Sequence, residues 1–344
     1  MFEFNYNKEL DVKQTQYYQG PLYVVLNITN RCNLKCLHCF NGSSSTNQCS
    51  EYELSDEEVI NVVKDVARLK VANFCFSGGE PLLRKELIYK SIKILSSHGV
   101  RCSIVSNGTL IDYNVAEKLK LLGVQEIEIS LDGNCSETHE RLRGVKGSFE
   151  KALKSVEYLC AIGITTSISY TLNSWNVDEV GPLIERLKDS GITSFYIRPL
   201  LVMGEASFHK ENISPSLQQY RKVFKIMKKY QEQNYNFEIG ITDPINHIYN
   251  LRNRVINNMV EIQSNGDLFP SYCIPVPIGN IKRHPLKDYW DKGLNRIWEF
   301  TSIGRLAEGI YSNKDLEKII SNIKTEVKMD FDIIDDNILF EGTW

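Results

Sequence analysis

Three cysteines stand close together near the start of the chain, at Cys32, Cys36 and Cys39. A loop that holds three thiolates within eight residues can wrap one inorganic cluster. A four-iron cluster that only transfers electrons normally takes four cysteine ligands, one for each iron. Three ligands would leave one iron open, and an open coordination position is what distinguishes catalytic from structural metal sites. The spacing therefore predicts an iron-sulfur centre that binds a substrate or cofactor directly.

A structural zinc site is the alternative, with His38 or a distant cysteine as the fourth ligand. Such zinc sites usually pair two short ligand motifs, and the sequence has no second CxxC and no HxxxH. The other six cysteines are scattered singly, so only the group of three requires an explanation. They are Cys49, Cys75, Cys102, Cys135, Cys160 and Cys273.

The composition narrows the class of protein. At 344 residues the chain can bury a large core without disulfides. Its 40 Lys and Arg against 43 Asp and Glu give no basic excess that would favour nucleic acid or an anionic membrane. No stretch approaches the roughly 18 apolar residues of a membrane span, and no signal peptide is recognised. We expect a cytoplasmic protein whose cysteines are reduced.

Alternating elements must position the cysteines. From about residue 22 to 200, short β-type runs alternate with amphipathic helical stretches, which is typical of βα units around a parallel sheet. Six units are two short of a closed eight-stranded barrel. We therefore expect an α/β fold, a partial (β/α)6 TIM-type barrel whose open side takes substrate. Strands are expected at 22–29, 73–77, 101–106, 126–131, 164–171 and 193–198.

The alternation stops after about residue 205, where a polar helix near 214–233 precedes a predicted hairpin around Asn265 and Gly266. We expect an N-terminal arm at 1–21, the barrel at 22–204, a helical connection at 205–258 and a small α+β region at 259–344.

The motif CxxxCxxC after the first strand, followed by Phe40, resembles the radical S-adenosylmethionine (SAM) superfamily. Segment 77–81, Ser-Gly-Gly-Glu-Pro, is similar to the GGEP segment of that family. The resemblance implies that Gly78, Gly79 and Glu80 receive the amino group of SAM. The glycines would let the backbone approach the ligand.

Further segments that follow predicted strands carry the same resemblance, and together they cover about residues 22 to 203. The resemblance implies that the ribose and carboxylate of SAM are contacted from two of these segments. Segment 139–144 is similar to the HDxxRG motif, which implies that its arginine pairs with the SAM carboxylate. The end of the sixth strand would lie near the adenine. The implied contact residues are Ser106, Asn107, Ser130, Asp132, Arg143 and Leu200.

The resemblance implies one 4Fe-4S cluster on Cys32, Cys36 and Cys39. An open iron would pass one electron to SAM, and the 5'-deoxyadenosyl radical would then abstract hydrogen from a substrate carbon. It also implies an external electron donor such as flavodoxin or ferredoxin.

The C-terminal segments 262–273, 278–281 and 286–290 resemble the SPASM or twitch extension of the peptide-modifying branch. That extension holds auxiliary clusters on several cysteines, whereas here Cys273 stands almost alone. We therefore expect a degenerate extension that serves as scaffold and substrate wall, with a single cluster per chain. Cys273 is then a core residue, a thiol hydrogen donor or the ligand of a shared cluster, and Cys135 competes for the thiol role.

The leading interpretation is a radical SAM enzyme that modifies a peptide or protein by cross-linking, epimerisation or dehydrogenation. A separate protein could bind the leader peptide. The alternative is a radical SAM enzyme acting on a small molecule, such as a sugar or cofactor precursor. A minor alternative is a non-catalytic iron-sulfur sensor or scaffold that binds SAM.

Overall fold

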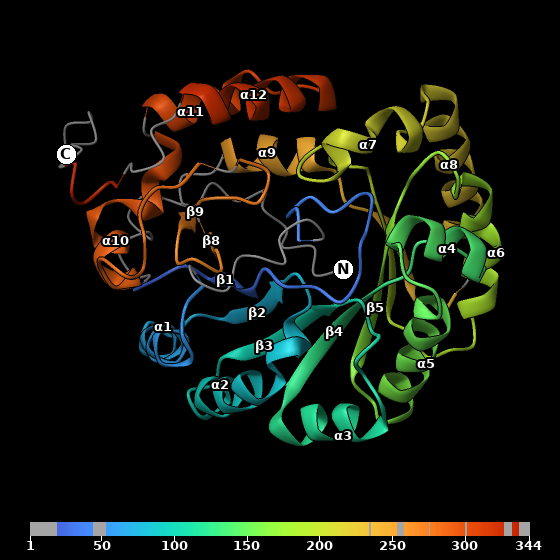
Figure 1. The fold of residues 1–344 in the computed structure, drawn as a ribbon, viewed down its shortest axis with the longest axis horizontal. Coiled ribbons are helices and arrows are strands. Elements are labelled where there is room, and N and C mark those ends of the chain that lie inside the picture. The colour runs from blue at the N-terminus through green and yellow to red at the C-terminus, as the bar shows by residue number, and fades with distance from the viewer. Residues whose placement is uncertain are drawn as a thin grey trace.

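The protein is described from a computed structural model, which covers residues 19–43, 53–233, 235–252, 258–274, 276–299, 301–326 and 332–336. Most of the expected N-terminal arm and Cys49 lie outside the described residues. A strongly twisted sheet forms the centre of the molecule, and helices lie along its outer side (Figure 1).

The described residues form nine strands in the order β7-β6-β5-β4-β3-β2-β1-β8-β9. All neighbours pair in parallel except β8 and β9, which pair antiparallel. The partial barrel of βα units is confirmed, and the six expected strands form within two residues of their expected bounds. The strands are β1 Tyr23–Thr29, β2 Asn73–Gly78, β3 Arg101–Ser106, β4 Val124–Ser130, β5 Thr165–Thr171, β6 Ser194–Arg198, β7 Glu238–Ile241, β8 Met259–Ile262 and β9 Leu268–Phe269.

Two parallel strands go beyond the expected six. β7 pairs with β6, and β8 pairs with the other edge of the sheet at β1. Both are only four residues long, so their sequences do not stand out from the helical and hairpin segments around them. The segment expected as a helical connection, 205–258, therefore contains one strand of the sheet, and the region expected from residue 259 begins with another. The expected hairpin at Asn265 and Gly266 is confirmed as the turn between β8 and β9.

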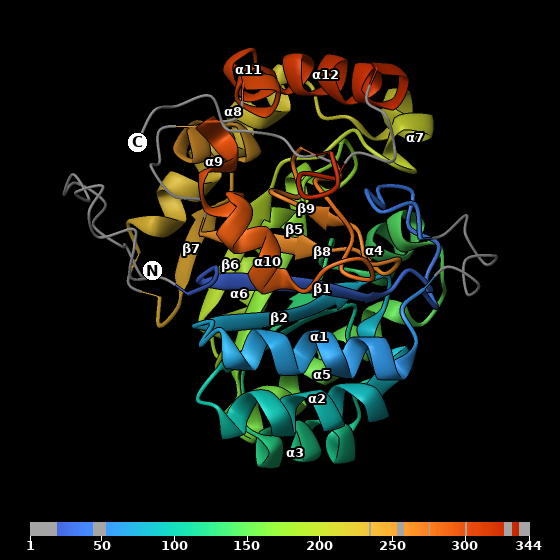
Figure 2. The same ribbon diagram turned by 90° about the vertical axis from the view of Figure 1, so that its left-hand side faces the viewer.

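Helices cover the outside of the sheet, and helices from the late part of the chain lie across the molecule from the early ones (Figures 1 and 2). In both views α2 and α3 lie on the opposite side of the molecule from α11 and α12 (Figures 1 and 2). No helix in the described ranges is long and apolar enough to cross a membrane. The helices are α1 Asp56–Arg68, α2 Lys85–Ser97, α3 Tyr113–Leu122, α4 Ser136–Arg143, α5 Ser148–Ala161, α6 Val180–Leu187, α7 Ala206–Ile213, α8 Leu217–Gln231, α9 Pro244–Arg252, α10 Leu286–Lys292, α11 Thr301–Glu308 and α12 Asn313–Glu326.

The two faces of the sheet differ in polarity. In β4, Ile127 and Ile129 are fully buried in the hydrophobic core, whereas the alternate residues Glu128 and Ser130 line a cavity. Successive side chains of a strand point to opposite faces. The outer face therefore packs against helices, and the inner face is largely polar and surrounds the interior of the barrel.

The expected capping box of α1 is present. The Glu58 amide donates to Ser55 Oγ at 3.2 Å, and the Ser55 amide donates to Glu58 Oε2 at 2.7 Å. Replacing Ser55 by alanine leaves a helix amide unpaired, so we expect Ser55→Ala to lower the free energy of unfolding by about 1 kcal/mol. Ser97→Ala in the last turn of α2 removes only exposed local hydrogen bonds, to the Ile94 carbonyl and to His98 Nδ1, and is the matched control. Equal denaturant midpoints for the two variants would contradict this account.

Candidate active site

The three clustered cysteines meet in the wall of one cavity at the carboxyl ends of the strands. This main cavity has a volume of ≈ 360 Å³. Cys32, Cys36 and Cys39 are free thiols in its wall, on the loop that follows β1. The wall also includes Tyr23, Val25, Phe40, Gly78, Gly79, Ser106, Asn107, Glu128, Ser130, Arg143, Arg198, Met259, Glu261 and Tyr272.

Backbone hydrogen bonds from three later segments hold the cysteine loop, residues 31–40. The Glu80 amide donates to the Arg31 carbonyl at 2.9 Å, and the Lys35 amide donates to the Arg143 carbonyl at 3.1 Å. A third bond joins the Glu205 amide to the Cys39 carbonyl at 2.8 Å. The loop is therefore held in place by the end of α4 and by the segments that follow β2 and β6.

Three glycines allow these segments to approach the loop. A Cβ on Gly79 would lie 2.3 Å from the Arg31 carbonyl oxygen, and one on Gly144 would lie 2.5 Å from the Lys35 carbonyl oxygen. On Gly204 it would lie 2.4 Å from the Phe40 carbonyl oxygen. These contacts are with backbone, which cannot rotate away, so only glycine fits at these positions.

Nitrogen donors surround the sulfur atoms. The Leu34 amide lies 3.4 Å from Cys32 Sγ, and the Ser43 amide lies 3.4 Å from Cys39 Sγ. Arg143 Nη1 lies 3.9 Å from Cys36 Sγ. Burial raises the pKa of the Cys36 thiol to about 12, although Arg143 opposes this shift. Donors of this kind stabilise thiolates bound to iron, so the residues fit a three-thiolate cluster.

Glu80 lies behind the wall and not in it. Its buried carboxylate accepts hydrogen bonds from the Leu82 amide at 3.1 Å, from Ser106 Oγ at 2.9 Å and from the Asn107 amide at 2.9 Å. Burial raises the pKa of Glu80 to about 7. Through these bonds Glu80 positions Ser106 and Asn107 in this structure, and the direct contact with SAM that the resemblance implied stays a prediction.

Arg143 and Asp132 form a buried ion pair. Arg143 Nε and Nη2 donate to Asp132 Oδ2 at 2.7 and 2.6 Å, and the Thr171 amide donates to Asp132 Oδ1 at 2.7 Å. Burial disfavours ionisation of Asp132, but Arg143, the nearby histidines and the Thr171 amide together hold the pKa of Asp132 below its usual value. Arg143 is in the cavity wall and Asp132 is not. The implied contact of Arg143 with SAM must therefore coexist with this pair.

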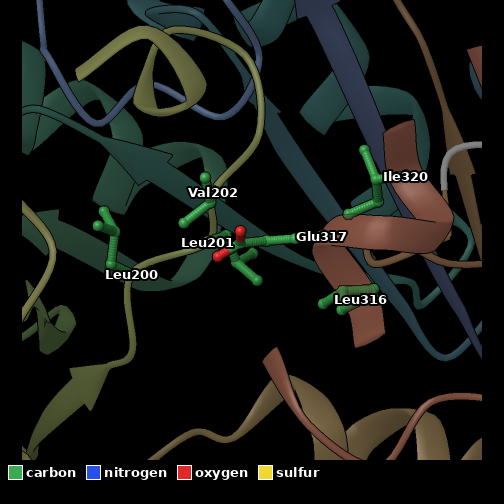
Figure 3. Close-up of a pocket in the computed structure, with 6 residues that line it drawn as sticks. All are labelled: Leu200, Leu201, Val202, Leu316, Glu317 and Ile320. Atoms are coloured by element: carbon green, nitrogen blue, oxygen red, sulfur yellow. The ribbon is translucent and has the colours of Figure 1, made fainter. Parts of the chain in front are cut away.

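Leu200 was expected beside the adenine but is not in the wall of the main cavity. It lines a small hollow of ≈ 10 Å³ between the segment after β6 and α12. Figure 3 shows it with Leu201 and Val202, which face Leu316, Glu317 and Ile320. After Pro199 it is Leu201, and not Leu200, that lines the main cavity.

The two candidate thiols also lie outside the cavity wall. Cys273 is fully buried in the hydrophobic core, and burial raises the pKa of its thiol to about 12. Cys135 is exposed at the start of α4, 3.6 Å from Thr138 Oγ1. The burial of Cys273 favours its interpretation as a core residue, and the thiol role of either cysteine stays a prediction.

The sequence analysis did not identify the polar floor of the cavity, formed by Tyr23, Glu128, Arg198, Glu261 and Tyr272. Arg198 pairs with Glu128 at 2.6 Å and donates to Ser169 Oγ at 2.6 Å. One signal was available, because polar residues alternate along β4, β5 and β6 where a filled barrel would carry apolar ones.

An open parallel barrel with three thiols close together at its carboxyl end is typical of one class of iron-sulfur enzymes. Residues 26–187 match the Radical SAM superfamily. The chain belongs to the radical SAM superfamily and is a radical SAM enzyme. Membership implies a 4Fe-4S cluster and SAM.

The chain is similar to the following three proteins, among others. The AdoMet-dependent heme synthase of Methanosarcina barkeri is 27% identical over 79% of this chain and 82% of its own length. The sporulation killing factor maturation protein SkfB of Bacillus subtilis is 32% identical over 54% of this chain and 44% of its own length. The crystal structure of Streptococcus suis SuiB bound to S-adenosylmethionine has a TM-score of 0.70 at 19% identity, covering 93% of this chain and 78% of that one. At that identity the likeness concerns the fold alone.

The glycine contacts predict a specific defect. We expect Gly79→Ala to displace the cysteine loop, lower the free energy of unfolding by about 1–3 kcal/mol and reduce iron bound after reconstitution. Gly309→Ala is the matched control, since a Cβ there would meet its nearest atom, Ile319 Cδ1, at 3.6 Å. Iron content and denaturant unfolding measure the two effects, and normal iron loading of Gly79→Ala would refute this role.

The buried ion pair predicts a second effect. Asp132→Asn leaves Arg143 without its counter-charge, so we expect the free energy of unfolding of the apoprotein to fall by about 3–5 kcal/mol. Asp65→Asn breaks an exposed pair with Arg68 and should cost under about 0.5 kcal/mol. Denaturant unfolding of both variants tests this, and equal small losses would show that the buried pair contributes little.

Proposed function

We propose that the chain holds a single 4Fe-4S cluster on Cys32, Cys36 and Cys39 and uses SAM to abstract hydrogen from a small organic substrate in the main cavity. The observation that carries this proposal is that one cavity joins the three thiols to a polar barrel floor. A substrate on the floor would face the cluster across the interior of the barrel.

Cys32, Cys36 and Cys39 would hold the cluster, which would supply the reductive cleavage of SAM and thereby the hydrogen abstraction from the substrate. The protein binds and orients the partners. Gly78 and Gly79 give SAM an approach to the backbone, while Ser106, Asn107 and Ser130 offer hydrogen bonds along the wall. Phe40 lines the same wall beside Cys39. An external donor such as flavodoxin or ferredoxin would supply the electron.

A small-molecule substrate replaces the peptide as the leading interpretation. The relative named as a heme synthase is similar over 79% of this chain, which favours a small molecule. A peptide or protein substrate is the second candidate, supported by the relative named as a maturation protein. In that case a separate protein would bind the leader peptide.

The number of clusters is part of the proposal. Cys273 is the only cysteine after Cys160 in the sequence, and it is buried in the hydrophobic core. An auxiliary cluster would need several further thiolates. We therefore propose one cluster per chain, with the C-terminal region serving as scaffold and substrate wall.

Anaerobic reconstitution with iron and sulfide tests these proposals. We expect about four irons per chain and release of 5'-deoxyadenosine from SAM under dithionite in the wild type. Cys36→Ala should lose both, whereas Cys160→Ala, on α5 and outside the cavity wall, should lose neither.

Two results would contradict the proposals. About eight irons per chain would show a second cluster, and bound zinc without SAM cleavage would refute radical chemistry. With activity established, metabolite and precursor-peptide panels distinguish the two substrate classes through substrate-dependent turnover.

A further inference from the structure

One carboxylate in the wall of the main cavity has an oxygen without a partner. Glu261 is 4% exposed, and its Oε1 accepts a hydrogen bond from Asn27 Nδ2 at 2.6 Å. Its Oε2 is buried and has no hydrogen-bond partner within the described part of the chain. A buried polar atom left unpaired costs free energy, so its presence in the wall of a site requires an explanation.

The strand register places this carboxylate on the inner face of the barrel. β8 lies parallel to β1, with Met259 opposite Tyr23 and Glu261 opposite Val25. All four residues line the main cavity. Val25 precedes the end of β1 at Thr29, so Glu261 lies below the rim that carries the cysteine loop. It therefore faces the substrate side of the cavity.

No cation in the described wall of the cavity balances this charge. Of the two arginines in the described wall, Arg198 pairs with Glu128 at 2.6 Å and Arg143 pairs with Asp132 at 2.6 Å. The described wall contains no lysine, and Nε2 of its one histidine, His38, lies 3.6 Å from Asp132 Oδ2. Burial raises the pKa of Glu261, and no cation is among the groups that act against this shift.

We propose that Glu261 binds a positively charged amino group of the substrate. The inference rests on the proposed function, because it concerns the substrate of the same cavity. An ammonium group donates a hydrogen bond to Oε2 and neutralises the carboxylate in one contact. A hydroxyl or amide would satisfy the oxygen but not the charge, and a substrate carboxylate would be repelled. The substrate class is therefore an amine whose other end extends toward the cluster.

Matched probes test the charge preference directly. Thermal unfolding of the reconstituted, SAM-loaded protein at pH 7 is followed with n-butylamine, 1-butanol and butyrate, which differ only in the head group. A ligand of the folded state raises the midpoint according to its affinity. We expect the wild type to bind butylammonium at least about tenfold more tightly than butanol, a difference of about 1.4 kcal/mol. Butyrate should bind most weakly.

Two variants assign that preference to Glu261. Glu261→Gln keeps the shape but removes the charge, so the advantage of the amine should fall to within about twofold. Met259→Lys tethers an ammonium group two residues earlier on the same strand face and should abolish the amine response while the carboxylate remains. Glu126→Gln, an acid of β4 outside the cavity wall, is the control and should keep the wild-type preference.

Each result bears on the inference. Equal binding of amine and alcohol by the wild type overturns it, as does an amine preference that persists in Glu261→Gln and Met259→Lys. If Glu261→Gln fails to fold, Met259→Lys decides alone. Release of 5'-deoxyadenosine by the wild type is measured in parallel: its absence refutes the proposed function, whereas its presence without an amine preference refutes only this inference.

Discussion

The geometry of the three thiols depends on close backbone packing between the cysteine loop and three segments far along the chain. Gly79, Gly144 and Gly204 touch this loop, and each belongs to a segment anchored by a different part of the barrel. Because backbone contacts cannot relax through rotamer changes, the position of each sulfur reflects the position of β2, α4 and β6. The metal centre is therefore defined by the whole partial barrel and not by the loop alone.

The interior of the barrel must also be able to hold a ligand. Its outer face carries the apolar residues that form the core, and its inner face carries charged and hydroxyl groups. Burying charges is costly unless they are paired, and the pairs Arg198–Glu128 and Arg143–Asp132 limit that cost. Stability thus comes mainly from the outer face, which leaves the inner face free to meet a ligand.

The sequence predicted the cysteines at the rim of the cavity better than it predicted the polar residues of the cavity floor. The motifs follow strands whose hydrophobic runs are plain, so the position of Cys32, Cys36 and Cys39 at one rim could be predicted. The short strands β7 and β8 could not, because four residues carry too little periodicity. The partners of Glu80 and Asp132 were also missed, since side-chain pairing depends on exact register. Glu261 reaches the cavity only through the pairing of β8 with β1, a contact between distant parts of the chain.

That pairing has a consequence for how the protein is made. β1 carries the cysteine loop, and its second neighbour, β8, ends at Ile262. During synthesis the strand therefore remains an open edge, with its thiols attached, until more than two hundred further residues have left the ribosome. Iron is then inserted either into a nearly complete chain or into a chain in which β8 has not yet paired with β1. The order of the strands along the chain therefore limits when a cluster can enter a finished site.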